Sequence, residues 1–349
     1  MALLMNYFEG SWLFHSWPVS ILLILAASIC ACIALGIVAV IGLGSNWLER
    51  KVSAHMQCRL GPMLVGWHGL LQPIADGIKF FIKEDIIPAM ADRRLFVIAP
   101  VVVFTGALLA WMVVPLGPRW VAADLNIGLL FLLATSPIVV IGIIMAGWAS
   151  HNKWSLYGTM RSAAQFLSYE VPTALHLLPP VLLAGSLNLR AIVEQQSGGF
   201  LGMGHWYIWN PFCLIAFVAY YVSSLAETGR IPFDLPESES ELVAGYHTEY
   251  SGMRLTFFFM ADYADLFMVS AVSSLLFFGG WHGPFGIHHP LIYIMKMMLF
   301  VLVAMWLRWT LPRLRIDQLM ATCWKFLIPL GLVNILGASF WMYLTGQVK

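Results

Sequence analysis

The stretch VSILLILAASICACIALGIVAVIGLGSNW, residues 19–47, contains no aspartate, glutamate, lysine or arginine. As an α-helix it would extend over about 44 Å, which exceeds the roughly 30 Å hydrocarbon core of a bilayer. The run is too long for the core of a signal peptide, and no A-x-A cleavage site follows it. The sequence therefore predicts a retained transmembrane helix at about residues 18–45.

The rest of the chain has the same character. It is 60% hydrophobic and 11% charged, with a mean hydropathy of +0.80, which excludes an ordinary soluble domain. Because a backbone in lipid must satisfy its own hydrogen bonds, apolar segments of this length form helices. We expect an all-α polytopic membrane protein, a single integral membrane domain over 1–349, with eight spans near 18–45, 95–116, 128–149, 162–184, 208–226, 255–279, 290–310 and 326–346.

Basic residues are distributed unevenly between the predicted loops. Of the nineteen lysines and arginines, fifteen lie in or beside the loops after spans one, three, five and seven. Since positively charged loops stay in the cytoplasm, both termini are expected outside it. The opposite side holds Arg119, Arg190 and Lys349, while Lys296 lies inside span seven near the outer edge, where its side chain can reach water.

The long loop after span one contains an amphipathic segment, LLQPIADGIKFFIKED. Its apolar residues fall on one helical face and its polar residues on the other. It is expected to lie as a helix at the cytoplasmic interface, either as a plain anchor or with a further role. The apolar face carries Leu70, Ile74, Ile78 and Phe81, and the polar face carries Gln72, Asp76, Lys79 and Lys83.

Residues 226–254, AETGRIPFDLPESESELVAGYHTEYSGMR, concentrate acidic side chains beside lipid. Ionisable groups near lipid are costly and often mark ion paths, and crowded carboxylates raise one another's pKa. The stretch is therefore either a proton path or a solvated acidic loop. Its carboxylates are Glu227, Asp234, Glu237, Glu239, Glu241 and Glu249, opposed by Arg230 and Arg254.

Three acids lie inside predicted spans. Glu170 in span four precedes Pro172, whose missing N–H loosens the helix; it is a candidate for ion handling or for a structural pair with an arginine such as Arg161. Asp262 and Asp265 share a face of span six. They either extend the acidic path into the membrane or pair with a neighbouring helix.

Metal and haem sites are not expected in this chain. The five cysteines form no CxxC motif, so an iron–sulfur cluster or a zinc site has no ligand set. His176 stands alone deep within a span and cannot supply two axial haem ligands. His282, His288 and His289 cluster in the last outer loop, where solvation is expected and a weak metal site is the alternative.

Four blocks of sequence point to a known family. They read ERKVSAHMQCRLGP (49–62), GLLQPIADGIKFFIKED (69–85), AETGRIPFDLPESESELVAGYHTEYSGM (226–253) and PRLRIDQLM (312–320). In this order they resemble the quinone-site membrane subunit of respiratory complex I, the H-subunit family of NADH-quinone oxidoreductases. The resemblance covers about residues 18–346, and the glutamate-rich block is its most specific part.

The resemblance implies a function within a larger assembly. It implies a non-catalytic subunit of a proton-translocating NADH-quinone oxidoreductase in a bacterial inner membrane, lining the quinone tunnel and coupling quinone reduction to proton translocation. Quinone is the implied substrate, and iron–sulfur clusters and FMN belong to partner subunits. The implied partners are the peripheral arm with the terminal iron–sulfur cluster, small membrane subunits, antiporter-like subunits and lipid; the net charge of +1 gives no sign of nucleic-acid binding.

The resemblance also implies roles for individual residues. The coupling acids that match are Glu170, Glu227, Glu237, Glu239, Glu241 and Glu249, and the position of Asp262 and Asp265 adds them to the same path. Charged positions near the tunnel entrance match Arg50, Arg59, Asp76, Lys79 and Glu84. Basic positions facing the peripheral arm match Arg230, Arg308 and Arg313.

Two other functions fit parts of the sequence. The membrane subunit of a ferredoxin- or F420-linked quinone or hydrogenase complex shares the AE…RIPFD core, but the continuation ESESELVAGYHTEYSGM favours the quinone-reducing branch. A stand-alone ion/proton transporter would also carry intramembrane acids, yet no inverted repeat is evident.

A long isoprenoid tail cannot cross an aqueous face, so a quinone portal must open to lipid. We expect the first span, the segment 69–85 and the sixth span to frame it. Small residues of the first span, namely Ala26, Ala27 and Ala31, are expected to line it.

Overall fold

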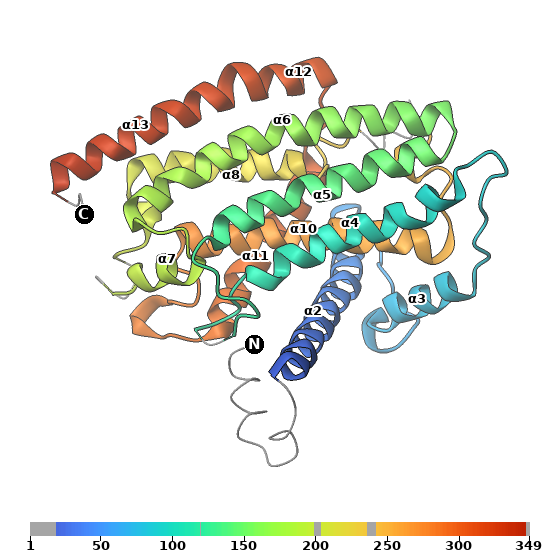
Figure 1. Cartoon of the computed structure of the whole chain (residues 1–349), viewed down its shortest axis with the longest axis horizontal. Coiled ribbons are helices and arrows are strands. Elements are labelled where there is room, and N and C mark those ends of the chain that lie inside the picture. The colour runs from blue at the N-terminus through green and yellow to red at the C-terminus, as the bar shows by residue number, and fades with distance from the viewer. Residues whose placement is uncertain (1–18, 119, 199–203, 236–241, 347–349) are drawn as a thin grey trace, which may run out of the picture.

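The computed structural model describes residues 19–118, 120–198, 204–235 and 242–346, which are largely α-helical (Figure 1). No β-strand occurs within these ranges, so the expected all-α fold is confirmed. The helices are α2 (Val19–Met56), α3 (Gln72–Ile82), α4 (Arg93–Val113), α5 (Gly128–Ala149), α6 (Lys153–Ala184), α7 (Leu189–Gln195), α8 (Pro211–Glu227), α10 (Gly252–Phe277), α11 (Pro290–Thr310), α12 (Ile316–Ala321) and α13 (Ile328–Thr345). Between α12 and α13 lies a π-helical segment, η6 (Thr322–Leu327).

Each of the eight predicted apolar segments contains a helix, but fewer than eight are clear membrane spans. Six continuous helical stretches in the described ranges are long and apolar enough to cross a bilayer, and α6 becomes a seventh together with α7 across a 56° bend. The predicted span 208–226 corresponds to α8, a shorter apolar helix of 17 residues. The protein is therefore a multi-pass membrane protein with six or seven spans by this criterion.

Several helices begin where an aspartate or asparagine can accept backbone N–H groups. Asp92 Oδ1 accepts from Arg94 and Leu95 at the start of α4, at 3.1 and 3.4 Å. Asn152, Asn188 and Asn210 cap α6, α7 and α8 in the same way. A capping oxygen satisfies donors that a helix cannot satisfy itself, so these residues fix where the helices start.

Prolines inside the spans free carbonyl groups, and neighbouring side chains satisfy two of them. Pro100 of α4 cannot donate to Phe96 O, and the Tyr250 hydroxyl donates to that oxygen at 3.3 Å. Pro172 of α6 likewise leaves Ser168 O, which accepts from Cys323 Sγ of η6 at 3.1 Å. Each break in a helix is thus tied to a different segment of the chain.

Helix α10 lies at the centre of the bundle and packs against α2, α3, α4, α8 and α11. From Leu266 to Phe277 all its residues are buried. Helices α4 and α5 pack closely: a Cβ at Gly142 would lie 2.5 Å from Val103 Cγ2, and one at Gly106 would lie 2.9 Å from Val139 Cγ2. Small residues at such contacts let membrane helices approach closely.

The amphipathic segment of the first loop forms α3, preceded by a short turn at Trp67–Gly69. Its predicted apolar face is exposed on this chain: Ile78 and Phe81 are 55% and 73% exposed. Its Asp76 is buried instead, because α3 rests with its polar face on α2 and α10. This orientation leaves the apolar face for lipid, as an interfacial helix requires.

We predict that Tyr250→Phe destabilises the protein, because the freed carbonyl of Phe96 loses its donor. A lost hydrogen bond to a buried group costs about 1 kcal/mol, which should lower the thermal unfolding midpoint of the purified membrane protein in detergent. Tyr293→Phe is the matched control, since the buried Tyr293 hydroxyl has no hydrogen-bond partner. Equal midpoints for the two variants would contradict this account of Pro100.

Candidate functional site

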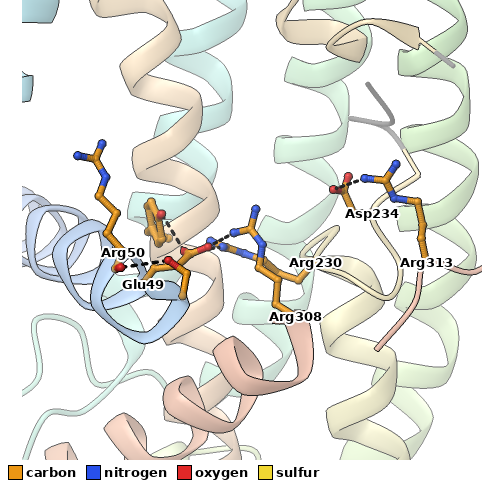
Figure 2. A network of polar contacts seen from close by, with 8 residues as sticks. Glu49, Arg50, Arg230, Asp234, Arg308 and Arg313 are labelled. Carbon is orange, nitrogen blue, oxygen red and sulfur yellow. Dashed lines mark hydrogen bonds and ion pairs between the residues drawn. The ribbon is translucent and has the colours of Figure 1, made fainter. Parts of the chain in front are cut away.

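A buried carboxylate, Glu49, lies near the end of α2 and holds two arginines. Arg230 Nη1 donates to Glu49 Oε2 at 3.2 Å, and Arg308 Nη1 pairs with Oε1 (Figure 2). The Tyr263 hydroxyl of α10 donates to Oε2 at 2.9 Å. The Glu49 and Arg230 side chains are only 8% and 10% exposed, so these charges rely on one another rather than on water.

A second ion pair lies beside this network. Arg313 Nη2 donates to Asp234 Oδ2 at 3.2 Å (Figure 2). The backbone runs alongside it, because Leu314 N donates to Pro232 O at 3.0 Å. The loop after α8 is therefore bonded to the segment after α11, which contains Arg313, one of the three arginines matched by the resemblance.

The first cavity opens between these groups and has a volume of about 110 Å³. That volume holds several water molecules, at roughly 10–15 Å³ for each. Its polar lining comes from α8 and the loop after it, α10 and α11: Thr228, Arg230, Asp234, Asp262, Tyr263 and Arg308. Phe166, Tyr246 and Phe259 add aromatic surface, so the cavity offers both charged and flat apolar walls.

The second cavity lies deeper in the bundle, has a volume of about 90 Å³ and is mostly apolar. Its polar groups are the side chains of Ser136, Thr173, Glu227, Asp262 and Asp265. Ser136 Oγ donates to Glu227 Oε1 at 2.6 Å. Thr228 and Asp262 line both cavities, which therefore adjoin one another.

Three of the predicted coupling acids, Glu227, Asp262 and Asp265, line the second cavity. Glu227 lies close enough to Glu170 and to Asp265 for their charges to interact, and Asp265 interacts in the same way with Asp262. The ion pairs given above do not include Glu170. Ion handling and a structural pair with an arginine both stay predictions for this residue.

A separate cluster surrounds Asp76 of α3. Arg50 Nη1 lies 2.7 Å from Asp76 Oδ2, and Lys79 Nζ lies 3.5 Å from Oδ1. Burial alone would raise the pKa of Asp76, but the Arg50 guanidinium and the hydrogen bonds from Arg50 and Gln72 hold it below its ordinary value. Asp76 therefore stays ionised down through mildly acidic pH, and the contribution of this pair to stability is lost only as the pH falls through the lowered pKa.

Other predicted site residues lie apart from both cavities. Arg59 Nε donates to the Gln57 side chain at 2.6 Å, and Glu249 Oε1 accepts from Asn152 Nδ2 at 2.6 Å. The backbone carbonyl of Glu84 accepts from Ser251 Oγ at 3.3 Å. Glu237, Glu239 and Glu241 fall outside the described residues.

The site residues predicted from the sequence do not include Glu49, although Arg230, Tyr263 and Arg308 all contact it. Its signal is present in the sequence, since Glu49 is the first ionisable residue after the uncharged run 19–47. Tyr263 and Ser136 carry no comparable signal, because a tyrosine or serine in an apolar helix is common and only the packing brings each to a carboxylate. No group of three potential metal ligands occurs among the described residues.

Comparisons with known proteins agree on one family. A family model described as NADH dehydrogenase matches residues 27–339. Three similar proteins are each named as the H subunit of an NADH-quinone oxidoreductase. The one from Chlorobaculum tepidum is 50% identical over 311 residues, covering 84% of this chain and 86% of that protein. The one from Dehalococcoides mccartyi is 48% identical, covering 84% and 80%, and the one from Anaeromyxobacter dehalogenans is 41% identical, covering 93% and 84%.

We predict that Glu49→Gln strongly destabilises the purified membrane protein, because Arg230 and Arg308 would be left without their counter-charge. Breaking a buried ion pair costs about 3–5 kcal/mol, and a second change, Arg308→Gln, should recover part of that loss. Asp317→Asn is the control, since it breaks the exposed pair with Arg315, whose side chains are 77% and 63% exposed. Thermal unfolding that is unchanged in Glu49→Gln would contradict the network's role.

Proposed function

This chain belongs to the NADH dehydrogenase family of membrane subunits, and from that premise we propose that its first cavity receives a quinone headgroup and its second cavity takes up the resulting charge change. The chain is a subunit of a proton-translocating NADH-quinone oxidoreductase, complex I, and is not catalytic alone. The observation that carries the proposal is that the two cavities share Thr228 and Asp262.

The first cavity suits a quinone headgroup. Arg230 and Arg308 supply donors for carbonyl oxygens that gain negative charge on reduction, and the aromatic walls suit a flat ring. Glu49 keeps both guanidinium groups in place. On the family resemblance, we assign the iron–sulfur clusters and FMN to the peripheral arm, so the electrons would come from a partner subunit.

The second cavity suits proton storage. Two-electron reduction of a quinone creates demand for two protons, which changes the charge beside Asp262. The four acids form a row in which each interacts with the next: Asp262, Asp265, Glu227 and Glu170. A proton gained or lost at one acid therefore changes the protonation of its neighbour. We assign these four acids to the coupling path that leads towards antiporter-like partner subunits. For Glu237, Glu239, Glu241 and Glu249 the proposal rests on the family resemblance alone.

The cluster at Asp76 suits a place at the quinone entrance. Arg50, Asp76 and Lys79 link α2 to α3 at the polar face of the interfacial helix, and Trp47 Nε1 donates to His68 O at 3.2 Å just before it. We further propose that this end of the bundle, with Arg313 and most basic residues, faces the cytoplasm and the peripheral arm. Both termini would then lie outside the cytoplasm, in a bacterial inner membrane.

We predict that Glu227→Gln leaves the complex assembled but lowers NADH-driven quinone reduction and proton translocation together, by about tenfold or more, since a loss of ~1.4 kcal/mol already gives tenfold. Asp265→Asn should act in the same way. Both rates are measured in membrane vesicles and normalised to the amount of complex. Glu194→Gln, at an exposed ion pair with Arg190, is the control. Proton pumping at the wild-type level in Glu227→Gln would sink the proposal.

The portal is the last part of the proposal. Helices α2, α3 and α10 pack against one another, as the framing hypothesis requires. Ala26, Ala27 and Ala31 do not lie at the depth of α3, because they precede Glu49 in α2 by 18–23 residues, about 27–35 Å. Gly42 is nearer, about 10 Å along the helix from Glu49, and faces Met260 of α10.

We therefore predict that Gly42→Phe slows the reduction of long-tailed quinones more than that of short-tailed analogues. A bulky ring between α2 and α10 would obstruct the tail but not a small headgroup that arrives from water. Gly36→Phe is the control, since a side chain there meets no other atom within 4 Å. Equal slowing of both kinds of quinone would place the portal elsewhere.

A further inference from the structure

A second polar cluster lies at the other end of the bundle, around Lys296 of α11. Lys296 and Arg308 are twelve residues apart in this helix, which is about 18 Å. Figure 1 likewise places α3 and α7 at opposite ends of the molecule. The residues around Lys296 take no part in the function proposed above.

The ammonium group of Lys296 is enclosed by backbone. It donates to Phe278 O, Gly280 O and His282 O at 2.5, 2.9 and 2.6 Å, and it lies 4.1 Å from the centre of the Trp206 ring. An ammonium group has three donors, so all are used. The group forms no ion pair with a described residue. The prediction that the Lys296 side chain extends to water is therefore wrong: its ammonium group is bound by the turn after α10.

The turn is shaped to hold that group. Gly279 and Gly280 have positive φ angles of 68° and 50°, and a Cβ at Gly279 would lie 2.6 Å from Trp206 Nε1. Gln196, fully buried, accepts from Gly279 N at 3.0 Å and donates to Leu275 O at 2.9 Å. The carbonyl groups around Lys296 are therefore fixed on both sides.

A layer of aromatic rings separates this cage from the acidic cavity. The ring of Phe217 lies 5.5, 5.0 and 5.6 Å from those of Phe277, Phe278 and Phe300, and Phe278 lies 5.1 Å from Phe300. Phe217 precedes Glu227 by ten residues in α8, about 15 Å. Phe300 is one turn beyond Lys296 in the direction of Arg308. The layer thus lies between the carboxylates and the ammonium group.

His282, beside the cage, adds no second positive charge. His282 Nδ1 and His288 Nδ1 are 2.7 Å apart, so one ring donates and the other accepts. Burial, together with the neighbouring His288 and Lys296, lowers the pKa of His282 to about 4, against smaller opposing effects of the Val193 backbone and Glu194. His282 is therefore neutral at pH 7. The three carbonyl acceptors and the Trp206 ring stabilise the ammonium form of Lys296, which places the positive charge of the cage on this residue.

We propose that the aromatic layer and the caged ammonium group of Lys296 form a seal that stops protons from passing between the acidic cavity and this end of the bundle. The rings leave no path of water along which a proton can move, and the fixed positive charge repels a hydronium ion that reaches it. Constrictions and fixed positive charges exclude protons in pores by the same two effects. The acids can then hand their protons to a neighbouring subunit without a leak through this one.

The seal is tested on the purified complex in proteoliposomes without NADH or quinone. A potassium diffusion potential set with valinomycin drives protons inward, and a pH-sensitive dye inside reports their rate. Lys296→Met removes the charge and keeps an apolar side chain, and it should raise the passive proton influx several-fold. Lys325→Met, at an exposed position on η6, is the matched control and should equal the wild type.

A second variant keeps the test decisive if Lys296→Met does not assemble. Phe300→Ala opens the aromatic layer and should also raise the influx, while Phe300→Leu should raise it less. A wild-type influx in every variant that assembles would overturn the seal. The seal rests on the proposed function in one respect, namely that the acids of the second cavity carry protons. If the proposed function failed, a different result would show it: the wild-type complex would reduce quinone without pumping protons.

Discussion

A buried ion pair stabilises both of its charges, and the carboxylate of Glu49 is the counter-charge that joins four segments of this protein. These are α2, the loop after α8, α10 and α11. The partners of Glu49 are 181, 214 and 259 residues away in the sequence. Loss of Glu49 would leave both arginines without their counter-charge. Arg230, Tyr263 and Arg308 also line the first cavity, together with residues of the loop after α8, so the ion network fixes part of the cavity wall.

The backbone near the acids also joins distant segments. Pro172 follows Glu170 by two residues, and the carbonyl that it frees at Ser168 accepts from Cys323. One residue along, the Tyr169 hydroxyl donates to Leu319 O at 2.8 Å. The helix that carries Glu170 is therefore bonded to α12 through Leu319 and to η6 through Cys323, and π-helical segments of this kind often accompany functional sites. A displacement of α12 or η6 would reach the neighbourhood of Glu170 through these two bonds.

Much of this was predictable from sequence. Long uncharged runs such as 19–47 define helices by length alone, and acids inside spans, such as Glu170 and Asp265, stand out because few charges surround them. The pairing of Glu49 with Arg230 and Arg308 was not predictable, because it joins distant segments and depends on how α2, α10 and α11 pack. The prediction for Lys296 was wrong because it too depends on packing. Its position near the end of a span predicts that the side chain reaches water, whereas the turn after α10 covers the ammonium group.

The two ends of α11 place a cation in two different environments. At Arg308 a cation meets the carboxylate of Glu49 and lines a cavity large enough for water. At Lys296 a cation meets three fixed carbonyl dipoles and aromatic rings, and the described residues offer it no acid. A group that is fully bonded and cannot reorganise does not relay protons. In the proposed function this difference sets a direction, since a proton that enters beside Glu49 would reach the acids of the second cavity before it reached Lys296.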